Sequence, residues 1–361
     1  MTENVKKCIY CGAVNPAWAK AHIMPRLMGT FKNQPTLGER ICVDCDHEVG
    51  KCEEHLAKCT INGVLLKHLG LTGRHKYRSS AFRRGHSGQG PIRMTTRVPG
   101  YAHEVRVEPI GDSKNVDIIP QLILVDACGG REEIAIENPN CISLGEWKIL
   151  LYMCREGRVK DLEAIGLADN QVALIIHIFQ KIGLTFDPPQ EATIPRFSGT
   201  ILTEGTLKYD ERYFRAIAKI AFHYYLAFND LNHCGSEDIF EPVRSFIRYG
   251  HGKVDTFVTE KKGHFVEDMK QGWRPPTYGH ILFAETTSQL ILVKVQPFVG
   301  PDYEPPYYDA LLSEKPFAIF VPKSSFGHNY SYLEAHQRKQ YCGTMHKLAV
   351  ASRIKVAREL M

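Results

Sequence analysis

Four cysteines near the start of the chain are spaced as ligands of a metal ion. Cys8 and Cys11 form one Cys-x2-Cys pair, and Cys42 and Cys45 form a second pair after thirty intervening residues. Two thiolates from one tight turn can occupy adjacent corners of a tetrahedron, and a second pair supplies the other two corners. Zinc is the expected ion, bound by four sulfur atoms at about 2.3 Å. A closed site of this kind carries out no chemistry itself and acts as a structural brace.

The stretch between the two pairs, AKAHIMPRLMG at 19–29, contains a histidine that could act as a base. An unperturbed imidazole has a pKa of about 6.5, so a neutral ring can accept a proton from water near neutral pH. The alternative is that His22 only packs and hydrogen-bonds beside the metal. The acidic context favours the catalytic interpretation, because Asp46 follows the second cysteine pair and Glu54 lies on a helix predicted from about 48 to 58.

These residues together resemble the HNH (ββα-metal) endonuclease motif, over residues 8–56. In many HNH members a zinc ion held by two Cys-x2-Cys pairs braces the active-site hairpin. The first half of the motif is matched by His22, Ile23 and Pro25. In the second half, CVDCDHEVGKCEEHL, Asp46 matches the family's asparagine, Gly50 its glycine and Glu54 its distal metal ligand. The sequence is also similar to a group of bacterial HNH-type proteins of comparable length that are suspected in phage defence.

The resemblance implies metal-dependent hydrolysis of nucleic-acid phosphodiesters, with DNA favoured over RNA. On this basis, His22 would be the base that takes the proton of the attacking water. Glu54 would bind a catalytic divalent ion, Mg²⁺ or Mn²⁺, that bridges the phosphate and the leaving group. Asp46 would tie down the backbone near the base by accepting hydrogen bonds from N–H groups.

Two positions differ from the family's pattern and leave a second interpretation open. Ala21 occupies the position of the family's first metal ligand, and Asp46 replaces an asparagine. An ionised aspartate cannot donate a hydrogen bond, whereas an asparagine can. The second interpretation is a catalytically inactive, zinc-containing module that binds nucleic acid or a protein partner.

Basic residues are concentrated in the first part of the chain. Residues 1–100 hold 16 Lys and Arg against 7 Asp and Glu, whereas the other 261 residues hold 29 against 33. Such asymmetry favours a polyanionic partner, and guanidinium groups bind phosphate well. The candidate nucleic-acid-binding side chains are Arg74, Lys76, Arg78, Arg83, Arg84 and Arg93. A solvated basic surface loop without a ligand explains the same charges.

The composition, with 43% hydrophobic and 24% charged residues, is that of an ordinary soluble globular protein. The N-terminal stretch MTENVKKCIYCG lacks the apolar core of a secretory signal, and no run of about 18 apolar residues predicts a membrane span. Without a signal, the eleven scattered cysteines favour a reducing cytoplasm over a disulfide scaffold. We therefore expect a cytoplasmic protein with no membrane partner, and homo-oligomerisation stays open.

Apolar periodicity predicts a mixture of strands and helices after residue 100. The expected strands lie at 103–111, 116–127 and 132–138, with a hairpin at 279–298 and a further strand at 316–322. The expected helices lie at 143–157, 169–183, 210–230 and, with basic amphipathic character, from 330 to the end.

The expected fold class is α+β. It combines a small N-terminal zinc-braced ββα-metal (treble-clef) module at 1–60, a basic connector at 61–100 and a larger mixed α/β domain at 101–361. The sequence leaves the role of the last domain open between recognition, regulation and dimerisation.

Overall fold

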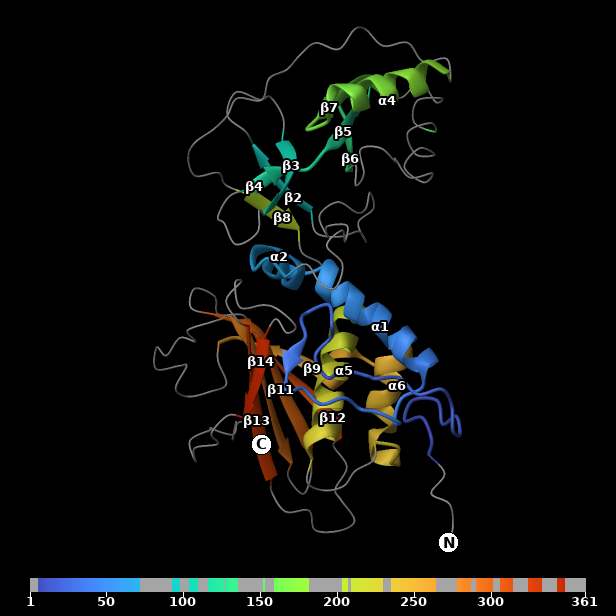
Figure 1. Ribbon diagram of the computed structural model, residues 1–361, viewed down its shortest axis with the longest axis vertical. Coiled ribbons are helices and arrows are strands. Elements are labelled where there is room, and N and C mark those ends of the chain that lie inside the picture. The colour runs from blue at the N-terminus through green and yellow to red at the C-terminus, as the bar shows by residue number, and fades with distance from the viewer. Residues whose placement is uncertain are drawn as a thin grey trace. The chain divides into compact units, whose positions relative to one another are not determined.

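The computed structural model contains two units that are not consecutive in sequence (Figure 1). The first unit combines Met1–Ala57 with Tyr209–Met361, and the second is Lys58–Lys208. This division differs from the three consecutive segments expected from the sequence, because the N-terminal segment packs with the C-terminal part of the chain. The structure describes residues 6–71, 93–97, 104–109, 116–126, 128–135, 152, 159–181, 203–206, 209–229, 235–263, 278–286, 290–300, 306–313, 324–332 and 343–347.

A seven-stranded sheet forms the centre of the first unit, in the order β1-β14-β13-β10-β11-β12-β9. Neighbouring strands are antiparallel, except that β1 runs parallel to β14. The strands are β1 (Phe31–Lys32), β9 (Val258–Lys261), β10 (Gly279–Thr286), β11 (Ile291–Val299), β12 (Tyr307–Ser313), β13 (Ser324–Tyr332) and β14 (Gly343–Lys347). Because β1 comes from the stretch between the cysteine pairs, the N-terminal segment forms one edge of this sheet.

The hairpin predicted at 279–298 is confirmed as β10 and β11, whose apolar side chains are buried in the middle of the sheet. The helical prediction for the C-terminal part is wrong where the structure describes it, because Gly343–Lys347 is the strand β14. Pairing of β14 with β13 and β1 outweighs the weak local preference suggested by the spacing of basic residues. The strand predicted at 316–322 lies outside the described residues.

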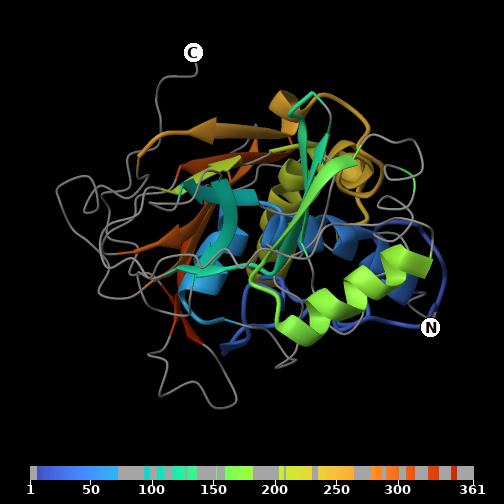
Figure 2. The same cartoon turned by 90° about the horizontal axis from the view of Figure 1, so that it is seen from above.

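Helix α5 (Glu211–Phe228) confirms the helix predicted at 210–230. One face of the helix packs on the sheet, where the Tyr213 hydroxyl donates to the Tyr308 hydroxyl and the Tyr224 hydroxyl to the Leu282 carbonyl. A second face meets α1 (Val43–Lys58), so α5 lies between that helix and the sheet (Figures 1 and 2). The other helices in the described part of this unit are η1 (Asp238–Phe240), α6 (Glu241–Tyr249) and α7 (Val254–Phe257).

The N-terminal segment forms two extended stretches that pair with each other and lead into α1. Ala19 donates its N–H to Ile41, and Leu37 to Ala21, both at 2.9 Å. His22 at the end of the first arm is bridged to Thr36 in the second. The chain thus passes through two paired arms and then a helix. Helix α1 begins about five residues earlier than predicted, directly after Cys42, and its first turn includes Cys45.

The second unit contains two small antiparallel sheets, in the orders β4-β3-β2-β8 and β6-β5-β7. Their strands are β2 (Arg93–Arg97), β3 (Glu104–Pro109), β4 (Val116–Ile118), β5 (Gln121–Asp126), β6 (Arg131–Ala135), β7 (Val159–Ile165) and β8 (Thr203–Thr206). Its described ranges include the helices α2 (Ile61–His68) and α4 (Asp169–Lys181), of which the latter confirms the helix predicted at 169–183. The core of this unit contains Val105, Val107, Ile123 and Ile165.

The α+β class is confirmed by these elements. Most of the helix predicted at 143–157 lies outside the described residues. Within the described ranges, no helix combines the length and apolar character needed to cross a membrane.

Candidate metal centre and the histidine beside it

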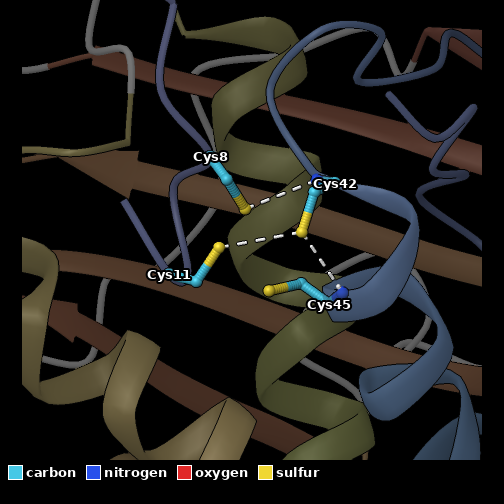
Figure 3. A group of neighbouring side chains, drawn as sticks. All are labelled: Cys8, Cys11, Cys42 and Cys45. Carbon is cyan, nitrogen blue, oxygen red and sulfur yellow. Dashed lines mark hydrogen bonds between the residues drawn. The ribbon is translucent and has the colours of Figure 1, made fainter. Parts of the chain in front are cut away.

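The sulfur atoms of Cys8, Cys11, Cys42 and Cys45 face one another (Figure 3). All four lie within 4.8 Å of one another, and those of Cys11 and Cys42 are 3.7 Å apart. Four sulfur atoms bound to zinc at about 2.3 Å would be about 3.8 Å apart at the corners of a tetrahedron. The cluster therefore fits a metal ion such as zinc.

Local backbone geometry explains how the cysteines gather. The first pair lies on a turn in which Gly12 donates its N–H to the Cys8 carbonyl at 2.8 Å and adopts a φ of +70°. Cys42 directly precedes α1, and its sulfur accepts the N–H of Cys45 in the first helical turn at 3.4 Å. Cys42 also donates its own N–H to the Cys8 sulfur at 3.4 Å. Helix N-termini favour thiolates, so this placement suits metal ligands.

The electrostatics of the cluster couple metal binding to proton release. Burial acts to raise the pKa of Cys8, but backbone N–H groups, first that of Cys42, outweigh burial and lower this pKa to about 7. Burial raises the pKa of Cys42 and of Cys45. Since metal ions bind thiolates, loading the cluster must displace protons from these buried thiols.

The imidazole of His22 is half-buried and has a defined partner. The side-chain amide nitrogen of Gln34 lies 3.3 Å from its Nδ1 and also donates to the Met24 carbonyl at 3.2 Å. An amide nitrogen only donates, so Nδ1 accepts and the neutral ring carries its proton on Nε2. The residues on either side, Ala21 and Ile23, are buried, which anchors the backbone before and after His22.

The backbone carbonyl of His22 is the point at which several buried polar groups meet. Lys219 donates to it at 2.7 Å, and Nδ1 of His223 lies 3.5 Å away. The other ring nitrogen of His223 lies 3.0 Å from the Tyr10 hydroxyl, and Lys219 also forms an ion pair with Glu53. Burial, reinforced by the charge of Lys219, lowers the pKa of His223 well below its usual value, so its ring is neutral.

The structure places the predicted acidic residues of α1 in different surroundings. Glu54 is exposed and Asp46 is half-buried, whereas Glu53, which the sequence interpretation did not select, contacts Lys219. Burial raises the pKa of Glu53, and the charge of Asp46 adds to this effect against the opposing charge of Lys219.

Among the described residues, the four cysteines are the one group of three or more His, Cys, Asp or Glu side chains gathered closely enough for a metal. His22, Asp46 and Glu54 do not form a second such group. The catalytic divalent ion implied by the family resemblance therefore has no support from a cluster of ligands in the described residues, and it stays a prediction. The backbone role expected of Asp46 falls instead to Lys219 and His223 at the His22 carbonyl.

The predicted nucleic-acid-binding residues are only partly described. Five of them lie at 72–92, outside the described residues: Arg74, Lys76, Arg78, Arg83 and Arg84. Arg93 opens β2 with its side chain 52% exposed, and it forms an ion pair with Glu133, whose side chain is 9% exposed. Its charge is therefore partly neutralised within the unit.

The polar residues around His22 that sequence reasoning missed come from distant parts of the chain. Lys219 and His223 lie four residues apart within the apolar stretch RAIAKIAFHYY, so they share one face of α5. Two polar side chains on one face of an otherwise buried helix were a detectable signal. Their partner was not detectable, because His22 precedes Lys219 by 197 residues.

Comparisons of the chain with protein-family models, curated proteins and solved structures give no match.

Proposed function

We propose that residues 6–57 form a zinc-braced site that hydrolyses nucleic-acid phosphodiesters, with His22 as the general base. The observation that supports this proposal best is the convergence of buried polar groups on the His22 backbone while its imidazole stays half-exposed. The family resemblance of the surrounding motif, with its hairpin-then-helix order, points in the same direction.

The buried polar groups around the His22 carbonyl add little to the stability of the fold, which favours a functional role for them. Lys219 is 2% exposed, and a buried ion pair such as Lys219–Glu53 contributes less to stability than apolar packing of the same volume. Buried ionisable groups with shifted pKa values cluster at functional sites, where a side chain must be held in one orientation. Here the group held in place is the peptide that carries His22.

The proposed chemistry uses Nδ1 of His22, which holds the one basic lone pair of the neutral ring. Because the Gln34 amide occupies that lone pair in this structure, the attacking water would take the place of the amide. The water would transfer a proton to Nδ1 as its oxygen forms a bond to phosphorus, while the bond to the leaving oxygen breaks and that oxygen takes up a proton from solvent. The imidazolium then returns the proton to solvent.

A specific observation favours a second candidate, a non-catalytic zinc protein that binds nucleic acid or a protein partner. The described residues form no second metal set around His22, and Glu54, the carboxylate expected to bind one, is exposed. In this case the polar network would serve only to attach the N-terminal segment to α5.

Plasmid nicking by the zinc-loaded full chain, with Mg²⁺ or Mn²⁺ supplied, distinguishes the candidates. We expect the wild type to nick and His22→Ala to lose about 100-fold or more of the rate, the usual scale for loss of a general base. His47→Ala, which removes an exposed histidine of α1, is the matched control and should nick as the wild type does.

Binding of labelled DNA and RNA at two salt concentrations is measured in parallel. Salt-dependent binding without nicking by the wild type would contradict the hydrolytic proposal and support the binding module. Absence of both activities would leave a protein partner as the ligand of the second candidate.

A further inference from the structure

We propose that Lys219 and His223 of α5 are positioning residues for His22, so that the site is completed by a helix far downstream in sequence. This inference rests on the proposed role of His22 and goes beyond it, since the motif at 8–56 contains neither residue. Lys219 and His223 do not reach the reacting atoms in this arrangement. They act on the backbone carbonyl that precedes Ile23.

The geometry at this carbonyl is specific. A carbonyl oxygen has two lone pairs, and here it accepts from the Lys219 ammonium at 2.7 Å and faces the Nδ1–H of His223 at 3.5 Å. Hydrogen bonds that involve a charged donor are stronger than neutral ones. The orientation of the His22 peptide is therefore set largely by α5.

The ammonium of Lys219 is itself held in place. Its side chain is 3% exposed and pairs with the Glu53 carboxylate, whose side chain is 18% exposed. A buried lysine with two fixed acceptors has little rotamer freedom left. Glu53 on α1 and His22 on the extended arm are thus connected through one nitrogen atom of α5.

The same network reaches the metal cluster. Tyr10 lies between Cys8 and Cys11 in the first cysteine turn, and its hydroxyl lies 3.0 Å from Nε2 of His223. Because Nδ1 of His223 faces the His22 carbonyl, Nε2 must accept, and the Tyr10 hydroxyl donates. Metal binding at the turn would therefore also hold Tyr10, and through His223 the peptide of His22.

This network would hold the His22 imidazole in an accurate position for the proposed reaction. A displacement of about 1 Å in a reacting group can lower a rate by about 100-fold. The α5 residues orient the peptide from which the His22 ring extends, and they contact only its carbonyl, so they leave the ring nitrogens available.

The test compares the double variant Lys219→Met/Glu53→Gln with the single variant Glu53→Gln. The double variant removes the ammonium without leaving a buried carboxylate unpaired, whereas the single variant keeps the Lys219–His22 hydrogen bond. Zinc content and thermal unfolding establish that each variant is folded. His223→Phe is a second, independent variant that removes the other donor and keeps the ion pair.

The primary readout is the NMR titration of the His22 imidazole in ¹³C-labelled full chain, with its signal assigned by its loss in His22→Ala. We expect the signal and its midpoint to be unchanged in Glu53→Gln but shifted in the double variant and in His223→Phe. Nicking should fall at least tenfold in these two variants at unchanged KM. Folded, zinc-loaded variants with an unchanged His22 titration would overturn the inference.

This design separates the two proposals. If the wild type does not nick, the proposed function fails, whatever the NMR titration shows. If the wild type nicks and His22→Ala does not, but the double variant nicks as Glu53→Gln does, the hydrolytic function stands and the positioning role is wrong.

Discussion

The guanidinium of Arg248 donates a hydrogen bond of 3.3 Å to the carbonyl oxygen of Tyr10, inside the first cysteine turn. Arg248 belongs to the last turn of α6, so a residue late in the chain supports a turn near its start. Burial acts to lower the pKa of Arg248, but nearby negative charge, first that of Cys45, more than offsets it and raises this pKa. The arginine therefore places positive charge beside the thiolates.

Removal of this charge should weaken metal binding. Four thiolates around a divalent ion carry net negative charge, which Arg248 partly neutralises. We expect Arg248→Met to bind zinc about fivefold more weakly, on the scale of about 1 kcal/mol for a partly exposed charged hydrogen bond. Competition with a chromophoric zinc chelator measures the change.

Arg248→Lys, which keeps the charge, should lose less affinity than Arg248→Met. Arg26→Met removes an exposed charge of the same unit and is the control without an expected effect. Equal affinities of wild type and Arg248→Met would show that the arginine holds the turn without influencing the metal.

Loss of one cluster cysteine should abolish stoichiometric metal binding. Cys42→Ser removes a buried sulfur that accepts the Cys45 N–H, and we expect zinc content to fall from near one equivalent towards zero. The free energy of unfolding should decrease by several kcal/mol because metal binding and folding are coupled. Elemental analysis and chemical denaturation test both effects.

The matched control is Cys52→Ser, since Cys52 is equally buried but lies outside the cluster. This variant should keep its zinc, with only a modest loss of stability from the polar replacement. Full zinc content in Cys42→Ser would contradict the four-cysteine site.

A backbone test is available at Gly12, whose φ of +70° lies in the left-handed region. A Cβ at this position would meet no atom within 4 Å, so Gly12→Ala changes only the backbone preference. We expect a loss of about 1 kcal/mol in stability, and a similar loss in metal affinity. Gly38→Ala is the control, because Gly38 also has open space but no left-handed backbone. An equal effect of both substitutions would exclude strain in the cysteine turn as the cause.

The buried histidine His280 should make the first unit sensitive to acid. Its Nδ1 accepts the Phe298 N–H at 3.1 Å, and burial lowers its pKa to about 3, with a hydrogen bond to the Met28 backbone opposing this shift. Below pH 6.5 the unfolded chain binds a proton at this residue and the folded chain does not. Stability should therefore fall as the pH decreases from about 6.5 towards 3, by about 1.4 kcal/mol per pH unit.

Urea denaturation of wild type and His280→Gln between pH 7.5 and 5 tests this expectation. The substitution lowers stability at every pH because the Phe298 N–H loses its partner, so the slope and not the absolute value is compared. Below about pH 6 the slope of the variant should be smaller by about 1.4 kcal/mol per pH unit, whereas above about pH 7 the two slopes should agree. If the free energy of unfolding depended on pH in the same way in both proteins, His280 would be protonated readily in the folded protein, and the expectation would be wrong. Proton uptake by other groups contributes equally to both proteins.

Local patterns in the sequence determined much of this protein. The Cys-x2-Cys spacing alone identified the metal cluster, because each pair lies on a single turn whose geometry a few residues decide. Apolar periodicity likewise predicted α5 and the β10–β11 hairpin, since both bury a continuous run of side chains. It failed for β14, whose strand conformation depends on neighbours from both ends of the chain.

Only the tertiary structure decided which groups surround His22. Adjacent residues on a helix point about 100° apart, so Glu53 and Glu54 cannot both face α5, and the docking of α5 selects Glu53. Lys219 and His223 reach the His22 carbonyl because the N-terminal segment packs on a helix that follows it by almost two hundred residues. Such contacts depend on how the elements pack, which no local spacing in the sequence encodes.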